Sequence, residues 1–479
     1  MEIKKVTGVY GVHLLGALFA LLCYKIAFNN LNENAFGVFV FFLLLSGIIS
    51  TFFDLGISKI TSKEVASEDS LGNISNYIKT INFVYVLIIF LLAITLPLLA
   101  DFLLTHWLNI HSIPSSDLKD FFKILLLASA ISVPVQYLNG IIVGLGNSRL
   151  LLLSGTMTPV STFGIWAIGF YTLDNLIVIG WVVFLGRCIS VFALLFIIRN
   201  NSPIRMGKFG FDTNALIKIK ESFLNLTTSS LIYVIVKNLD RLLASKILEI
   251  DIYALYDIAV QLFSRTGVLV NTAINIYFKK LIELTKVKKD NLQAFFDFQK
   301  WVGKYIGLLF LCISLFASEV LSFVFIGFES DRFRLLLSLL PIAFYINSTT
   351  RILSVFSLIH NKTNIIKINS ILLLTGSLLS IPILYKYGLD GFAFYALFIQ
   401  LIGFISYQVL FSKYINNNFF NLVMEKFSWF FIIIILLLCI ACINYLFVLN
   451  LYVKFLVFLV ILFIFYFELR EDVDYDTRL

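Results

Sequence analysis

The residues best suited to chemistry in this sequence are charged side chains that lie inside long apolar segments. Lys237, Asp240 and Arg241 are spaced i, i+3 and i+4, which places them on one face of a helix. Asp257 and Arg265 lie about two helical turns apart on the next segment, again on one stripe. A charge near the centre of a bilayer costs about 2.5–3.5 kcal/mol, so it faces protein or water rather than lipid. The two stripes therefore predict a shared polar space.

Further charges lie singly in other apolar segments, near the middle of a segment or close to one end. Cations outnumber anions among them, and this excess suits an anionic ligand, because guanidinium and ammonium groups match phosphate well. The candidate substrate-binding cations are Lys25, Arg187, Lys237, Arg241, Arg265 and Arg351. The candidates for ion coupling or for structural ion pairing are the carboxylates Asp54, Asp240 and Asp257.

Several of these charges have a purely structural alternative, which the sequence leaves open. Asp240 can form a structural ion pair with Lys237 or with Arg241, which would lock its helix to a neighbour. Lys25 can extend to the outer headgroups along its aliphatic stem. Asp54 lies close enough to the end of its segment to pair or cap locally. Each candidate is therefore a functional hypothesis with a structural rival.

No cofactor and no metal site is predicted from the remaining polar residues. The cysteines lie inside apolar segments without the spacing of metal ligands or of a disulfide framework. They are Cys23, Cys188, Cys312, Cys439 and Cys442. The formal net charge is +8, but the basic residues lie mainly between apolar segments rather than on one amphipathic face. Nucleic acid is therefore excluded as a partner.

The elements that must position these charges are membrane-spanning helices. The 479 residues are 59% hydrophobic and 14% charged, and the apolar residues come in blocks long enough to cross a bilayer. We predict an all-α integral membrane protein of about fourteen transmembrane helices. The predicted spans are 7–27, 36–59, 81–103, 120–143, 150–172, 176–198, 222–246, 251–278, 302–327, 333–359, 366–386, 390–412, 429–448 and 451–469.

The distribution of Lys and Arg between the spans predicts the orientation. Basic residues are concentrated in 199–220 and 279–300, which lie on the same side of the predicted topology, whereas 104–118 has neither Lys nor Arg. Basic connections mark the cytoplasmic side, so both termini are predicted in the cytoplasm. The basic start, residues 1–5, leads into an apolar run with no small-residue cleavage site. It is therefore interpreted as the beginning of the first membrane helix.

A weak internal repeat predicts two related halves. Residues 147–149 precede a helix that leads to 171–174, and 361–363 precede a helix that leads to 387–390. Transporters are often built from such repeats. We predict two six-helix lobes in a pseudo-twofold repeat, followed by two C-terminal helices. The predicted domains are an N-terminal lobe 1–200, a cytoplasmic linker 201–221, a C-terminal lobe 222–412, and helices 13 and 14 with a cytoplasmic tail in 413–479.

Several motifs carry a family resemblance that covers most of the chain. They are Asn238–Arg241, followed by Tyr253 and Tyr256; Phe53–Gly56, which closes the second span; and Gly140–Arg149 between the fourth and fifth spans. With the fourteen-span layout, the chain resembles Wzx-type polysaccharide flippases of the MOP superfamily, which also contains MATE drug exporters and lipid II flippases.

The resemblance implies a MATE-like fold whose two lobes enclose a central cavity that opens alternately to each side. The implied substrate is an oligosaccharide on undecaprenyl pyrophosphate, such as an O-antigen unit, moved from the cytoplasmic to the periplasmic leaflet of a bacterial inner membrane. Asp240 and Arg241 match the charged pair of the family, whereas Arg187, Arg265 and Arg351 rest on their position alone. The implied energy source is an H+ or Na+ gradient, since no phosphate-binding Gly-Lys motif is present.

The implied partners are the lipid-linked oligosaccharide, membrane lipids and other polysaccharide-assembly proteins. One alternative function is a MATE-like, ion-coupled exporter of small molecules. Another is a membrane polymerase or ligase, but such an enzyme needs a large outer loop to hold catalytic residues, and the predicted outer loops are short. We therefore predict a transporter and not an enzyme.

Overall fold

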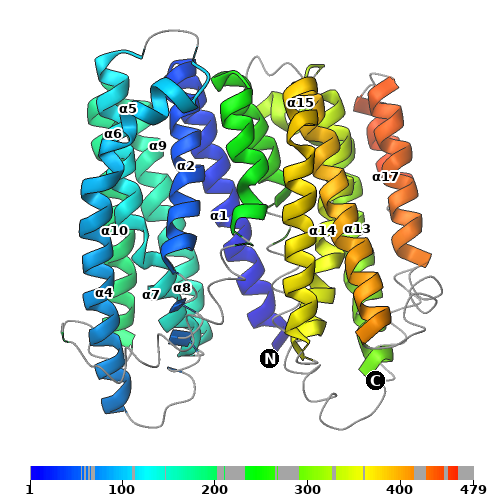
Figure 1. The fold of residues 1–479 in the computed structure, drawn as a ribbon, viewed down its shortest axis with the longest axis horizontal. Helices are drawn as coiled ribbons and strands as arrows, with labels where there is room; N and C mark the ends of the chain where they lie inside the picture. Colours follow the sequence, from blue (N-terminus) through cyan, green and yellow to red (C-terminus); the bar gives the residue numbers. More distant parts are fainter. Residues whose placement is uncertain are drawn as a thin grey trace. The chain divides into compact units, whose positions relative to one another are not determined.

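The computed structural model is built from helices in every part of the chain that it describes (Figure 1). Two compact units divide the chain, unit 1 from Met1 to Ile258 and unit 2 from Ala259 to Leu479. The described residues are 2–54, 57–58, 61–62, 65, 71–110, 114–145, 147–201, 210, 232, 234–264, 267, 291–325, 331–359, 362–414, 428–446 and 451–461.

Unit 1 is a bundle in which α6 and α10 lie at the centre. α6 contacts α2, α4 and α10, while α10 also packs on α7, α8 and α9. Its helices are α1 (Glu2–Asn30), α2 (Glu33–Asp54), α4 (Leu71–Leu98), α5 (Ala100–Phe102), η1 (Leu103–Trp107), α6 (Ser116–Ser132), α7 (Pro134–Gly144), α8 (Ser148–Pro159), η2 (Val160–Gly164), α9 (Ile165–Thr172) and α10 (Leu176–Asn201). Residues 234–247 and 250–264 are also helical, and the second helix crosses the boundary between the units.

Two prolines shape the helices that contact α10. Pro134 is the first residue of α7, so the predicted fourth span is divided into α6 and α7 at Val133. Proline lacks a backbone N–H and cannot continue the hydrogen-bond ladder of a helix. Pro159 ends α8, and the next five residues form the wider turn η2, a π-helix. Such turns re-aim the side chains around them and are frequent at functional sites.

Two connections that are predicted to lie on the same side contact each other. The N–H of Ile250 donates to the carbonyl of Asn109 at 3.2 Å, and Asn109 forms an isolated bridge with Glu249. Trp107 Nε1 donates to Ser245 Oγ at 3.1 Å. The residues after η1 therefore lie at the same end of unit 1 as the turn between helices 234–247 and 250–264. This agrees with an even number of crossings between the two connections.

Unit 2 is built around α14, which packs on α13, α15 and α17. Its named helices are α13 (Asn291–Val324), α14 (Arg334–Ile359), α15 (Thr363–Tyr414) and α17 (Ser428–Leu446), and residues 451–461 are also helical. α15 contains two predicted spans joined at Gly388, whose φ of +52° is in the left-handed region that favours glycine. Gly388 therefore makes the reversal between the spans 366–386 and 390–412.

The predicted all-α membrane fold is confirmed. Eight helices in the described residues are long and apolar enough to cross a membrane, and two shorter apolar helices lie at 429–445 and 451–461. Each predicted span overlaps a described helix. The contact boundary at Ile258 falls later than the predicted linker 201–221, because residues 234–258 pack with unit 1. The predicted linker lies almost wholly outside the described residues.

Candidate functional site

The hairpin of helices 234–247 and 250–264 is closed by a buried ion pair. Arg241 Nη2 donates to Asp257 Oδ2 at 2.9 Å, and Arg241 Nε donates to Asp257 Oδ1. The Asp257 side chain is fully buried, and that of Arg241 is 16% exposed. A two-point guanidinium–carboxylate pair is the strongest common type of charge-assisted contact. Arg241 is therefore neutralised inside unit 1, by a residue of the neighbouring helix.

Asp240 faces the same neighbouring helix through a hydrogen bond. The hydroxyl of Tyr256 donates to Asp240 Oδ2 at 3.1 Å. Tyr253 lies one turn before Tyr256 on the same helix. It is fully buried, and its ring centroid is 6.1 Å from that of Phe41 in α2. The hydroxyl of Tyr253 has no hydrogen-bond partner within the described part of the chain. The hairpin thus carries a carboxylate that accepts a hydrogen bond from Tyr256, and a hydroxyl, that of Tyr253, with no partner among the described residues.

Arg187, near the middle of α10, is held in a different way. Its guanidinium carbon lies 4.8 Å from the ring centroid of Trp166 and 6.0 Å from that of Phe42. Its Nε is buried without a hydrogen-bond partner, and among the described residues no carboxylate pairs with it. Aromatic faces attract a cation without neutralising it. Arg187 therefore keeps a positive charge that can attract an anion.

The position of Trp166 beneath Arg187 is fixed by two features of α10. Trp166 Nε1 donates to the carbonyl of Val183 at 2.9 Å. A Cβ at Gly186 would lie 2.6 Å from Trp166 Nε1, so only glycine permits this approach. Long side chains on a helix lean toward its N-terminus, which brings Arg187 back over the Trp166 ring.

Further unpartnered polar atoms lie on α10, on η2 and at the end of α8, three elements that contact one another. The hydroxyls of Thr158, Thr162 and Ser190 are buried and make no hydrogen bond to the part of the chain that the structure describes. Ser190 is one turn along α10 from Arg187, and Thr162 is one turn before Trp166. Buried polar groups normally have partners, so a concentration of exceptions marks a place for water or a ligand. We call Arg187, Ser190, Thr162 and Thr158 the polar column.

Tyr24 of α1 links the two arginine regions. It is buried and lies close enough to both Arg187 and Tyr253 to interact with each electrostatically. Its neighbour Lys25 is half-buried near the same end of α1. Unit 1 therefore gathers Arg187, the Arg241–Asp257 pair and Asp240 around α1 and α2.

The remaining predicted residues lie elsewhere. Asp54 is buried at the end of α2, where it accepts hydrogen bonds from Ser58 Oγ at 2.7 Å and from Tyr85 at 3.2 Å. Lys237 is exposed, one turn before Arg241. Arg351 belongs to unit 2, where its Nε donates to Asn347 Oδ1 at 3.1 Å. Arg265 lies outside the described residues.

The described residues contain no group of His, Cys, Asp or Glu side chains that could hold a metal ion.

Comparison with known proteins identifies the family. The model of the polysaccharide biosynthesis protein family matches residues 3–277, more than half of the chain. The chain belongs to the polysaccharide biosynthesis protein family. The match covers every residue of the polar column and of the Arg241–Asp257 hairpin. No curated protein matches the sequence significantly.

Solved structures of the MOP superfamily share the fold of this polysaccharide biosynthesis protein. An inward-facing MATE multidrug resistance transporter has a TM-score of 0.68 at 16% identity, covering 85% of this chain and 98% of its own. The lipid II flippase MurJ, in an inward closed conformation, has a TM-score of 0.64 at 15% identity, and the match covers 92% of this chain and 98% of MurJ. A MOP superfamily transporter from Pyrococcus furiosus has a TM-score of 0.57 at 16% identity, and the match covers 87% of this chain and 96% of that transporter. The predicted MATE-like fold is thus confirmed, and the chain is a multi-pass membrane protein of the polysaccharide biosynthesis family.

Sequence reasoning missed the residues that set the character of this site. Trp166 and the hydroxyls of the polar column were not among the candidates, although Thr158 and Thr162 flank a proline and are four residues apart. A proline inside a span next to hydroxyl side chains is a usable signal, because the ring frees backbone groups and widens the turn.

Proposed function

We propose that this protein moves a lipid-linked oligosaccharide from the cytoplasmic to the periplasmic leaflet of a bacterial inner membrane. Membership of the polysaccharide biosynthesis family supports a glycan cargo, and the fold shared with the flippase MurJ supports a lipid-linked one. The finer proposal is an undecaprenyl-pyrophosphate-linked unit of O-antigen or a related surface polysaccharide. Alternating access, driven by an H+ or Na+ gradient, would move it.

The observation that carries the proposal is the guanidinium of Arg187, which no carboxylate in the described part of the chain neutralises. Arg241 is neutralised by Asp257, so the anion-binding role predicted for several cations falls in unit 1 mainly on Arg187. A pyrophosphate offers several acceptor oxygens, and a guanidinium binds such groups through paired N–H donors. The hydroxyls of Ser190, Thr162 and Thr158 would offer further hydrogen bonds along the same contact.

The ion-coupling part of the proposal falls on Asp240. The Tyr256 hydroxyl donates to its Oδ2, which leaves acceptor capacity on the carboxylate, whereas Asp257 is engaged at both oxygens by Arg241. A carboxylate in this setting can take up and release a proton or Na+ as the surrounding helices move. The change in its occupancy would bias the two access states.

Deletion of the gene, followed by analysis of the lipid-linked glycans of the inner membrane, tests the function. We expect one lipid-linked oligosaccharide to accumulate on the cytoplasmic leaflet and surface polysaccharide to fall. Complementation with Arg187→Ala should restore less than about a tenth of the transport, a loss of ~1.4 kcal/mol or more of binding. Arg187→Lys should restore an intermediate level, because it keeps the charge but loses the paired donors.

Arg199→Ala is the matched control, since Arg199 lies on the same helix and is exposed. It should complement fully. If no glycan accumulates in the deletion strain, the flippase proposal fails. If Arg187→Ala leaves transport intact while efflux of cationic drugs depends on the gene, the MATE-like exporter is the better description.

A further inference from the structure

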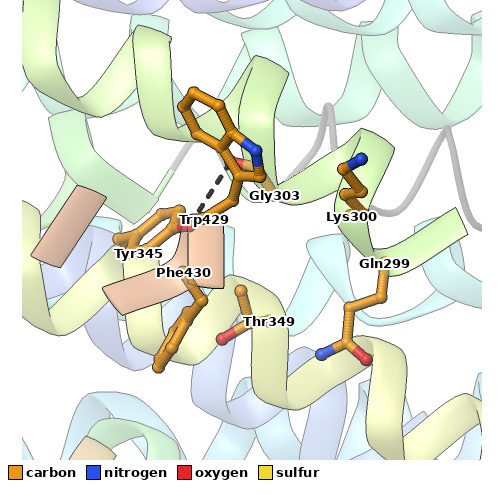
Figure 2. A pocket seen from close by; sticks show the side chains of 7 residues that line it. All are labelled: Gln299, Lys300, Gly303, Tyr345, Thr349, Trp429 and Phe430. Atoms are coloured by element: carbon orange, nitrogen blue, oxygen red, sulfur yellow. Dashed lines mark hydrogen bonds between the residues drawn. The ribbon is translucent and has the colours of Figure 1, made fainter. Parts of the chain in front are cut away.

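A small recess in unit 2 is lined by polar and aromatic side chains from three helices. α13 contributes Gln299, Lys300 and Gly303, α14 contributes Tyr345 and Thr349, and α17 contributes Trp429 and Phe430 (Figure 2). The fully enclosed part of the recess is no larger than about one water molecule, and the rest is open to the surroundings. None of these residues belongs to the polar column or to the Arg241–Asp257 hairpin.

The floor of the recess is made rigid by stacked aromatic rings. The ring of Phe430 is stacked 5.5 Å from Tyr345 and 4.7 Å from Phe404 of α15. The hydroxyl of Tyr345 donates to the carbonyl of Gly303 at 3.4 Å, the dashed line in Figure 2. The aromatic layer thereby fixes the spacing of α13, α14 and α17, and the recess is a built feature rather than a gap left by loose packing.

The side chain of Gln299 enters this recess without a partner. It is 2% exposed, and neither its Nε2 nor its Oε1 makes a hydrogen bond to any described residue. Gln299 lies one turn before Gly303, and Thr349 lies one turn after Tyr345. Figure 2 shows both on the same side of the Tyr345–Gly303 hydrogen bond. A buried carboxamide that is left unsatisfied costs about 1–3 kcal/mol per polar atom, so the site favours an occupant that supplies both an acceptor and a donor.

The recess lies next to the predicted ends of two apolar spans. The predicted span 302–327 begins two residues after Lys300, and the predicted span 429–448 begins at Trp429. Tryptophan at the end of an apolar helix is typical of the membrane–water interface. Lys300 is exposed at the rim, and buried Lys304 has its Nζ 4.7 Å from the Trp429 ring centroid. Basic pockets between transmembrane helices at this level suit anionic headgroups.

We propose that this recess binds the phosphate-bearing headgroup of an anionic membrane lipid. The Gln299 amide N–H and the Lys300 ammonium would donate to the phosphate, and a headgroup hydroxyl would donate to the Gln299 carbonyl. Phosphatidylglycerol offers both a phosphate and hydroxyl donors, whereas phosphatidylcholine offers a phosphate but no donor. The proposal goes beyond the transported substrate, and it holds or fails independently of the role of Arg187 in unit 1.

Lipid retention by the full-length protein tests the proposal. Purified protein is stripped of lipid in detergent and titrated with phosphatidylglycerol or phosphatidylcholine, and bound lipid is counted by native mass spectrometry. We expect phosphatidylglycerol to be retained about tenfold more tightly than phosphatidylcholine, a difference of ~1.4 kcal/mol. Gln299→Leu and Lys300→Met should each reduce that preference by about fivefold or more, consistent with the loss of one hydrogen bond to a charged group.

Two further variants keep the experiment decisive. Gln299→Glu keeps the size of the side chain and adds a negative charge, so it should abolish retention even if Gln299→Leu unfolds. Lys386→Met is the control, because Lys386 is an exposed lysine beside Tyr387 at the other end of the membrane helices. Retention of phosphatidylglycerol that survives both Gln299 variants overturns the proposal. So does inorganic phosphate that binds as tightly as the lipid, since the ligand would then be a free anion.

Discussion

Arg241 and Arg187 are both half-buried arginines of unit 1, yet their surroundings differ in kind. Arg241 meets a fully buried carboxylate at two points, while Arg187 rests on the faces of Trp166 and Phe42 with a buried Nε that has no acceptor among the described residues. The first arrangement cancels charge and joins two helices. The second preserves charge and leaves donors unused. A buried arginine therefore indicates function only when its partners are known.

The comparison also separates the costs of the two arrangements. A buried ion pair is weak support for a fold but costs several kcal/mol when one partner is removed, because the other charge remains buried. An arginine over aromatic rings contributes about 0.5–2 kcal/mol, and its loss strands no opposite charge. Stability measurements should therefore identify Arg241 as structural, while transport measurements should identify Arg187 as functional.

The largest expected effect follows from breaking the Arg241–Asp257 pair. Arg241→Met removes the guanidinium from the fully buried Asp257 carboxylate and should destabilise unit 1 by about 3–5 kcal/mol. Asp257→Asn should cost less, because the remaining guanidinium is 16% exposed and can reach water. The measurement is thermal unfolding in detergent, in which the fraction of protein that remains monodisperse is recorded at each temperature.

A double variant and a surface pair sharpen this result. Arg241→Met with Asp257→Leu removes both charges and should recover most of the stability. Lys123→Met breaks the exposed pair with Asp120, 3.1 Å apart, and should cost less than about 1 kcal/mol. If the double variant is stable but transports nothing, the ion pair has a role in transport beyond its role in the fold.

The second prediction concerns the platform under Arg187. Gly186→Ala places a methyl group 2.6 Å from Trp166 Nε1, so the ring must move away from α10. Overpacking of this kind costs about 1–3 kcal/mol. Transport should fall with the unfolding temperature, and Gly47→Ala, where a Cβ meets nothing within 4 Å, is the matched control on α2. Equal behaviour of the two variants would contradict the role of Gly186.

The membrane spans could be predicted from the sequence, because a block of about twenty apolar residues has the length of a membrane-spanning helix. The partner of Arg241 was within reach, since Arg241 and Asp257 are nearly equidistant from the turn at 248–249 and so lie at one depth of a helical hairpin. Both residues lie on the two predicted stripes, but the carboxylate predicted to pair with Arg241 was Asp240.

The environment of Arg187 could not be predicted in the same way. Its position in the middle of an apolar span marked it as unusual, but the approach of Trp166 depends on the absence of a side chain at Gly186 and on the widened turn after Pro159. Both are details of tertiary packing. Hydropathy gives the depth of a residue in the membrane and the face of its helix, but not which aromatic ring lies across from it.

The third prediction distinguishes the two contributions of Trp166. Trp166→Phe keeps an aromatic face for Arg187 but loses the hydrogen bond to the carbonyl of Val183. The expected loss of stability is about 1–2 kcal/mol, from one buried hydrogen bond and a weaker cation–π contact. Trp166→Leu removes the face as well, so it should reduce transport further at a similar unfolding temperature. Equal transport by the two variants would show that the aromatic face has no part in the cycle.

The smallest effect is expected at Asp54, where the ion-coupling and structural interpretations can be separated. Its carboxylate accepts hydrogen bonds from the hydroxyls of Ser58 and Tyr85 at the end of α2. Two turns earlier on α2, Ser46 forms a buried hydrogen bond with Ser132 of α6. Asp54→Asn removes the charge but keeps one acceptor oxygen, so stability should fall by only about 1 kcal/mol. Transport should be unchanged at every imposed ion gradient, whereas Asp240→Asn should abolish the dependence on the gradient. A loss of gradient dependence in Asp54→Asn, with the fold intact, would move the coupling site from the Tyr256-bonded carboxylate to the end of α2.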